Sequence, residues 1–258
     1  MLIIDDTIVK KYLSGQSPES YSDCWIYYAF DRGCLFETPN SSNCEWVAEL
    51  CGKLKSQINS FILRNYDLVQ KLFPCFDDVA NEYTIMLVVG FPDPYDAMVM
   101  SHNGTEYMVF DLIQFGRDSL EEDYSCHRVL THELIHMCLH KKYPVPENSL
   151  YHEILDYTAF DEGFAHALTY PENIYNFQFD DCHKIKYGKA KDKLKIAWEE
   201  TDTKKQKEYS VSADTGDYWE KFASISGKLY LLKNIDNIYE IYNNGWNGFV
   251  NKIINDIN

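Results

Sequence analysis

The residues best suited to chemistry are two histidines and a glutamate that lie close together in the chain. Residues 131–136 read THELIH, so His132 and His136 are four residues apart and Glu133 directly follows the first histidine. If this segment is helical, the spacing places both imidazoles on one face, one turn apart. Two neutral imidazole nitrogens can then bind one zinc ion and leave a position for water. The motif therefore predicts His132 and His136 as zinc ligands and Glu133 as general base.

Chance would produce this pattern in roughly one or two chains of this size per hundred. The residues between the histidines, Leu134 and Ile135, are apolar, and so is much of the surrounding segment. A core helix does not direct two histidines and a glutamate inward unless a function offsets their desolvation. The context therefore favours a metal site over a coincidence.

A third protein ligand must come from another segment. The next predicted helix contains DEGFAHA at residues 161–167. We expect Glu162 to be the ligand, because its small neighbours Gly163 and Ala165 would let this helix approach the zinc-binding helix closely. Four further side chains of this region remain alternatives: Asp161, Asp156, Glu153 and His152.

Two more histidines lie near these motifs. His140 is eight residues from His132, which is about 12 Å along a helix axis and too far for a shared ion. We expect His140 to cap the helix or to face solvent. His166 lies four residues after Glu162, on the same predicted helical face. It is a candidate for a residue that orients a metal ligand without binding the metal itself.

The pair of motifs resembles the gluzincin clan of zinc peptidases, in which H-E-x-x-H is followed by a glutamate ligand on a later helix. Residues 161–165, DEGFA, are similar to the Asn-Glu-Gly-Phe-Ala segment of the zinc aminopeptidases of that clan. A similar element occurs in short predicted bacterial zinc-dependent proteases, whose size is closer to this chain. The matching stretch is roughly residues 83–170. The resemblance implies a zincin-like fold, one Zn²⁺ per chain, and hydrolysis of peptide bonds by a metal-activated water.

The chain also departs from the aminopeptidase pattern. His136 and Glu162 have 25 residues between them, no Gly-x-Met-Glu-Asn element occurs, and position 166 is His where an acid is expected. The resemblance further implies a downstream Tyr or His that stabilises the oxyanion. We select Tyr218, because it opens a predicted helix whose Gly227 would permit close packing. The alternatives are Tyr230, Tyr209 and His183.

The elements that must position these residues follow from apolar spacing. The spacing predicts a helix over 44–72, interrupted near Asn65 and with Ser42 or Asn43 as N-cap. A buried strand is predicted over 83–90. Strands over 97–101 and 106–112 flank Asn103-Gly104, a strong hairpin signal.

The motif helix is predicted over 119–140, with Ser119 and Glu122 as a capping box. Further helical segments are predicted over 147–169, 185–199, 218–232 and 239–254. We expect an α+β, zincin-like fold that is mainly helical, with a small antiparallel sheet next to the H-E-x-x-H helix. Strand 106–112 is expected at the sheet edge, where an extended peptide could add as another strand.

The length suits a single metallopeptidase unit over 1–258. Within it we expect a mostly helical N-terminal wrap over 1–80, a zincin core with the metal site over 81–170, and a helical C-terminal part over 171–258. No internal repeat or long linker suggests a different division.

Composition narrows the partners. The net charge is −16, from 40 acidic and 24 basic residues, so we expect no nucleic acid partner. The resemblance to zinc peptidases implies a peptide or protein substrate. The start MLIIDD is not a signal peptide, and no run is long enough to span a membrane, so a cytoplasmic location is expected. The eight cysteines contain no C-x-x-C pair and are expected to be free, mostly buried thiols. The sequence leaves the oligomeric state open.

Three alternative functions remain open. Residues 131–140, THELIHMCLH, also resemble peptidases that cleave phage-type repressors, so a regulatory peptidase with one protein substrate is possible. A non-catalytic zincin-fold interaction protein would keep the fold without hydrolysis. The composition does not exclude a toxin-like protease that needs delivery.

Overall fold

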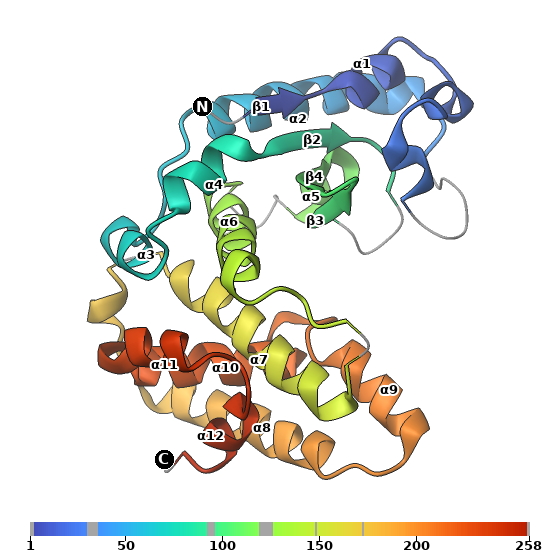
Figure 1. Ribbon diagram of the computed structural model, residues 1–258. Helices are drawn as coiled ribbons and strands as arrows, with labels where there is room; N and C mark the ends of the chain where they lie inside the picture. The colour runs from blue at the N-terminus through green and yellow to red at the C-terminus, as the bar shows by residue number, and fades with distance from the viewer. Residues whose placement is uncertain are drawn as a thin grey trace. The chain divides into compact units, whose positions relative to one another are not determined.

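The chain is described from a computed structural model that covers residues 3–29, 36–91, 96–118, 126–147, 149–171 and 173–256 (Figure 1). It divides into two compact units: Met1–Leu63 with Asp77–Glu133, and Arg64–Phe76 with Leu134–Asn258. The division falls inside one continuous helix, α6 (Cys126–Lys142). The expected organisation, a single unit with its zincin core at 81–170, stays a prediction.

The first unit contains a four-stranded sheet in the order β1-β2-β4-β3, built from β1 (Ile3–Asp5), β2 (Thr84–Val88), β3 (Ala97–His102) and β4 (Thr105–Asp111). β2 pairs in parallel with both β1 and β4, whereas β3 and β4 are antiparallel. The sheet is therefore mixed, and the expectation of an antiparallel sheet is wrong. Apolar patterning identifies strands but not their partners, and β1 was not predicted at all.

The predicted hairpin is confirmed. β3 and β4 are joined by a two-residue turn, Asn103 and Gly104, whose φ values are 50° and 76°. Tight hairpin turns of this kind require a positive φ at both residues. β4 lies between β2 and β3, so the expectation that it forms the sheet edge is wrong. Among the described strands the edges are β1 and β3, and strand addition by a peptide would have to use one of them.

Successive side chains of each strand point to opposite faces of the sheet and pack in different parts of the first unit's core. Met86, Val88 and Val109 pack with Ile8 of α1 (Thr7–Leu13) in one buried cluster. Phe110 points to the opposite face, where its ring lies edge-on to Phe115 of α5 (Leu112–Asp118), with centroids 5.6 Å apart. The sheet is thus buried by apolar side chains on both faces.

The long helix predicted over 44–72 is two helices, α2 (Ser41–Asn59) and α3 (Tyr66–Leu72), and α4 (Phe76–Glu82) follows. Asn40, not Ser42 or Asn43, is the N-cap of α2, because its side chain accepts a hydrogen bond from Ser42 N at 3.0 Å. The interruption near Asn65 is confirmed: Asn65 has a φ of 50° and precedes α3.

The second unit is helical in its described part. Besides α3 and the end of α6 it contains α7 (Tyr151–Leu168), α8 (Asp181–Trp198), α9 (Thr203–Ser212), α10 (Phe222–Lys233), α11 (Ile238–Asn244) and α12 (Phe249–Ile254). α10 packs against both α7 and α8 (Figure 1). The helix predicted over 239–254 is interrupted, because Gly245 and Gly248 have φ values of 72° and 73°.

Two glycines set the approach of α7 to α10. A Cβ atom on Gly227 would lie 1.9 Å from the carbonyl oxygen of Ala159, and one on Gly163 would lie 2.9 Å from Gly227 Cα. The expected close packing at Gly227 is therefore confirmed. Gly163 serves this α7–α10 contact, so the expectation that it lets α7 approach the helix with the H-E-x-x-H motif is incomplete.

Short 3₁₀ turns occur at Pro18–Tyr21, Trp25–Tyr28, Ile174–Asn176, Tyr218–Glu220 and Ile235–Asn237. Within the described ranges no helix combines the length and apolar character needed to cross a membrane. The described cysteines are free thiols, of which Cys51, Cys126 and Cys138 are buried and Cys75 and Cys182 are exposed. Cys34 and the predicted capping box at Ser119 and Glu122 lie outside the described residues.

Candidate metal centre

Helix α6 carries the H-E-x-x-H motif, as the sequence predicts. Because α6 is continuous through the motif, His132 and His136 lie one turn apart on one face. His136 and Glu133 are buried, with 7% and 8% of their surface exposed, and His132 is half-buried. The helix therefore presents two imidazoles and a carboxylate where water has restricted access.

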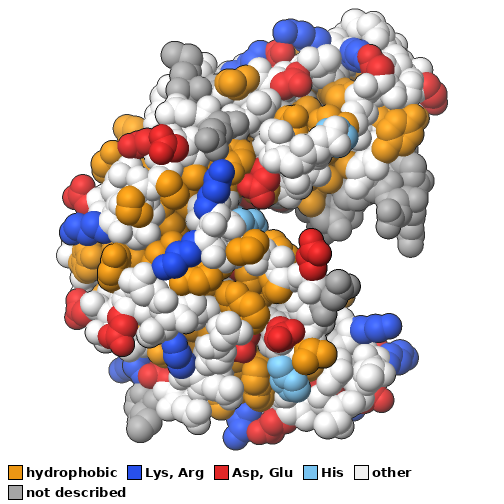
Figure 2. Space-filling view, in the orientation of Figure 1, with side chains coloured by type: hydrophobic (Ala, Val, Ile, Leu, Met, Phe, Trp, Pro, Cys, Tyr) orange, Lys and Arg blue, Asp and Glu red, His pale blue; other side chains and the backbone are white. Residues whose placement is uncertain are grey.

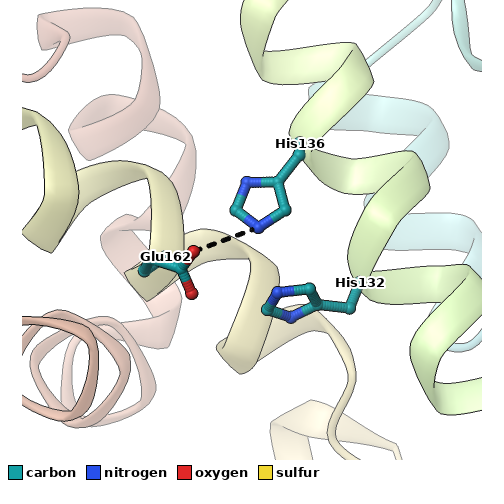
Figure 3. Close-up of side chains that lie close together, drawn as sticks. All are labelled: His132, His136 and Glu162. Carbon is teal, nitrogen blue, oxygen red and sulfur yellow. Dashed lines mark ion pairs between the residues drawn. The ribbon is translucent and has the colours of Figure 1, made fainter. Parts of the chain in front are cut away.

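Glu162 of α7 completes a cluster with these histidines. One ligand atom from each of His132, His136 and Glu162 lies within 4.8 Å of the other two. The closest measured pair is His136 Nε2 and Glu162 Oε1, at 3.4 Å. Figure 3 shows the two imidazole rings and the carboxylate turned toward a common space. The three candidate ligands selected from the sequence are thus brought together.

One distance in this cluster and its set of donor atoms are those that a zinc ion accepts. Ligand atoms at about 2.0 to 2.1 Å from zinc in a tetrahedral arrangement are about 3.3 Å from one another. The 3.4 Å between His136 Nε2 and Glu162 Oε1 matches that spacing. Two imidazole nitrogens and one carboxylate oxygen also form a donor set that zinc accepts, with one position left for water or substrate.

Burial disfavours the charged form of the Glu162 carboxyl, and a neighbouring cation would favour it. Desolvation raises its pKa to about 7, although the charge of His136 opposes the rise. A cation within a few ångströms favours the ionised form of a carboxyl and would lower this pKa. The electrostatic environment of Glu162 is therefore that of a group suited to bind a positive charge.

Asp161 supports the cluster from the other side of His136. Its Oδ2 lies 2.8 Å from His136 Nδ1 and 3.4 Å from His140 Nε2. Burial alone would raise the pKa of Asp161, but the charges and hydrogen bonds of the two histidines hold it at about 2. With Nδ1 directed at this carboxylate, the His136 ring keeps Nε2 on the side of Glu162.

The structure corrects the sequence interpretation of two residues here. His140 is half-buried and adjoins Asp161, so the expectation that it caps the helix or faces solvent is wrong. Asp161, considered only as an alternative ligand, lies beside the ring nitrogen of His136 that faces away from Glu162. Its position next to Glu162 in the sequence could have indicated that Asp161 lies near the cluster. Which ring nitrogen of His136 it faces depends on how α6 and α7 pack.

His166 and Tyr218 extend the cluster beyond Glu162. His166 Nε2 lies 3.4 Å from Glu162 Oε2, the carboxylate oxygen that does not face His136. The ring of Tyr218 packs edge-on against His166, with centroids 5.5 Å apart. Lys228 Nζ donates a hydrogen bond of 2.7 Å to the Tyr218 hydroxyl oxygen. His166 therefore occupies the supporting position predicted for it, and Lys228 is a neighbour that sequence reasoning missed.

The other candidate ligands have structural partners of their own. Asp156 accepts hydrogen bonds from Gly248 N and Val250 N at the start of α12. Glu153 accepts one from Leu150 N at the start of α7, and His152 Nε2 lies 2.8 Å from the Trp198 carbonyl oxygen. These contacts account for the three side chains without a metal.

The other candidate oxyanion donors are likewise engaged in packing. The ring of Tyr230 lies edge-on to Phe249, and Tyr209 packs similarly on Phe222. His183 Nδ1 lies 2.7 Å from Asp180 Oδ1 at the start of α8. Of the four candidates, only Tyr218 has a described ring contact with a residue that adjoins Glu162.

Surface charge gives no sign of a phosphate-binding face in the view of Figure 2. Lys and Arg side chains (blue) of the described residues form small separate groups there, with acidic side chains (red) among them. Electrostatic binding to a nucleic acid backbone needs several basic residues acting together. The absence of a nucleic acid partner stays a prediction.

Comparisons of the chain with models of protein families, with curated proteins and with solved structures found no match in any of the three. The interpretation of the metal centre therefore depends on its own residues: two histidines and a glutamate whose ligand atoms lie within 4.8 Å of one another.

Proposed function

We propose that this chain is a zinc-dependent peptidase in which His132, His136 and Glu162 hold one zinc ion. The observation that carries the proposal is the convergence of their ligand atoms to within 4.8 Å. Glu133, which follows His132 in the chain, is buried. Two residues of α6 and one of α7 meet there although 25 residues separate His136 from Glu162. A mixed sheet that precedes the motif helix is compatible with the proposed zincin-like fold.

The chain's own residues have distinct roles in the proposed reaction. Zinc, when bound, would polarise the substrate carbonyl and lower the pKa of a water molecule. The Glu133 carboxylate accepts a proton from the attacking water and returns it to the leaving amine. Asp161 and His166 hold His136 and Glu162 in their orientations. Burial of Glu133 limits competing contacts with bulk water.

Tyr218 is the proposed donor to the oxyanion. Because Lys228 donates to the phenol oxygen, the tyrosine's own proton is left to be donated to another acceptor. The positive charge of Lys228 also strengthens the phenol as a donor. Replacing the hydroxyl in Tyr218→Phe is expected to lower kcat by roughly 10²-fold with little effect on zinc content.

An intact, buried Glu133 favours catalysis over a purely structural metal. A structural zinc site is closed by four protein ligands and has no use for a base beside them. Among the residues that the structure describes, three candidate ligands converge, which would leave a fourth position for water or substrate.

Zinc content measured by plasma mass spectrometry tests the proposal. We expect about one zinc per chain in the wild type, and loss of most of it in Glu162→Gln. Glu220→Gln is a matched control, because Glu220 belongs to the same unit and its side chain is 72% exposed. Glu133→Gln should keep the zinc but fail to cleave a peptide library that the wild type cleaves.

Two results would contradict the proposal in different ways. If the wild type binds no zinc after reconstitution, or if Glu162→Gln binds it equally well, the ligand set is wrong. If zinc is bound as expected but no peptide is cleaved, the site is not that of a peptidase, and the chain is better explained as an interaction protein.

A further inference from the structure

A cavity of about 240 Å³ lies beside Glu162, wholly within the second unit. Its lining comes from the loop after α6, from α7, and from Asp214 in the loop after α9. Pockets for drug-sized ligands are usually roughly 300 to 1,000 Å³. The cavity is therefore of a size for one side chain or one terminal group of a substrate, directly beside a proposed zinc ligand.

The walls of the cavity are suited to an aliphatic chain. Val145, Pro146, Ile154 and Tyr157 supply apolar and aromatic surface. Val145 and Ile154 are 58% and 36% exposed, so part of this apolar surface faces solvent. Methylene groups of a ligand would cover this surface and remove it from water.

The polar side of the cavity is acidic. Asp161 and Glu162 are engaged with the histidines described above; Asp161 Oδ1 is buried and accepts no hydrogen bond within the described residues, although His140 Nε2 lies 3.4 Å from it. Asp214 forms no ion pair with another residue in the ranges that the structure covers, and burial raises its pKa. Lys221 lies close enough to oppose that rise without forming an ion pair. The cavity thus holds one carboxylate, that of Asp214, which has no ion-pair partner among the residues that the structure covers.

The backbone next to Asp214 is fixed in place. Ala213 is fully buried, and its carbonyl oxygen accepts hydrogen bonds from Ala223 N at 3.0 Å and Ser224 N at 3.3 Å. These contacts tie the loop to the first turn of α10. A backbone restrained next to Asp214 reduces the freedom that the loop loses when a ligand binds.

We propose that this cavity binds a cationic group of the substrate, with Asp214 as the carboxylate that recognises it. The inference depends on the proposed peptidase function for its placement beside the cleaved bond. A Lys or Arg side chain fits best, because its methylene stem matches the apolar walls and its head reaches the carboxylate. The net charge of −16 would also attract a cationic substrate.

The test compares peptides that carry Lys or Arg with matched peptides that carry norleucine or citrulline at the same position. We expect the zinc-loaded wild type to prefer the cationic peptides in kcat/KM by about tenfold to a hundredfold, as a charge-assisted hydrogen bond allows. Asp214→Asn should remove most of this preference. Asp217→Asn, the same change at an exposed position three residues away, should retain it.

Amino-terminal acetylation distinguishes two sources of the cation. A preference that survives acetylation identifies the Lys or Arg side chain. A preference that disappears identifies the free α-amino group, which has the same chemistry. Equal rates for cationic and neutral peptides, or a preference that persists in Asp214→Asn, would overturn the inference.

A binding measurement separates this inference from the proposed function. Calorimetry with the zinc-loaded Glu133→Gln variant and the same peptide pairs needs no turnover. Tighter binding of cationic peptides that depends on Asp214 would support the cavity assignment even if the wild type cleaved no peptide. Equal binding of both peptides would reject the assignment whatever the outcome for catalysis.

Discussion

Replacing Gly227 by alanine should force α7 and α10 apart. The new Cβ atom would lie 1.9 Å from the Ala159 carbonyl oxygen and 3.0 Å from Gly163 Cα. Both are backbone atoms, so no rotamer change can relieve the contact. An ordinary contact begins near 3.4 Å, and reaching it requires about 1.5 Å of local separation between the two helices. The variant therefore tests whether this crossing positions the segment that carries Glu162.

The expected cost exceeds that of an ordinary substitution. Overpacking of a core usually costs about 1 to 3 kcal/mol, and a clash with backbone lies at or above the upper end. We expect Gly227→Ala to lower the free energy of unfolding by at least about 3 kcal/mol. Glycine 188 offers the control, because a Cβ atom there meets nothing within 4 Å and the residue is inside α8. Gly188→Ala should instead stabilise the chain by about 0.5 to 1 kcal/mol.

Urea unfolding followed by far-ultraviolet circular dichroism measures both variants under the same conditions. Zinc content measured on the folded fraction adds a readout of the site, since displacement of α7 moves Glu162. A Gly227→Ala variant within about 0.5 kcal/mol of the wild type would refute the reasoning, because it would mean that α7 and α10 do not approach as closely as described.

Three further predictions concern single side chains. Asp161→Ala should weaken zinc binding by about 10- to 100-fold in a competition titration without abolishing it, because Asp161 orients the His136 ring. An unchanged zinc affinity would exclude this orienting role. Burial raises the pKa of Asp111 from 3.8 to about 6, so protonation of Asp111 stabilises the folded state. This contribution to the free energy of unfolding, up to about 3 kcal/mol, is fully present below pH 3.8 and is lost as the pH rises through 6. Unfolding measured across this range should show that loss in the wild type and not in Asp111→Asn. Asn65→Ala should lower the free energy of unfolding by about 3 kcal/mol. Asn65 has a positive φ, and its side chain donates hydrogen bonds to Leu168 O and Tyr170 O and accepts one from Ile174 N. A loss of less than about 1 kcal/mol in thermal unfolding would contradict that account.

Local features were the ones that the sequence could predict. The Asn103-Gly104 hairpin is confirmed because positive φ angles favour these residue types. The interruption at Asn65 is confirmed for a related reason, since asparagine tolerates the left-handed conformation. Helix ends were less accurate: α2 begins after Asn40, because capping depends on which side chain reaches a free backbone N–H.

Strand partners could not be predicted in the same way. The segments that form β2, β3 and β4 were identified, but β4 was assigned to the edge and lies inside the sheet. β1 is only Ile3–Asp5, too short to show a period, and it pairs with β2 about eighty residues away. Pairing between distant segments depends on the path of the whole chain, which local periodicity does not contain.

The sequence by itself determined that His132 and His136 lie together, because a spacing of four residues in a helix fixes two side chains on one face. It also identified Glu162, although the reason given for it was incomplete, since Gly163 packs against α10. Only the tertiary structure decided that Asp161 faces His136 Nδ1 and that Asp214 lines a cavity beside Glu162. Those relations depend on how helices far apart in the chain pack, and packing is a property of the whole unit rather than of any one segment.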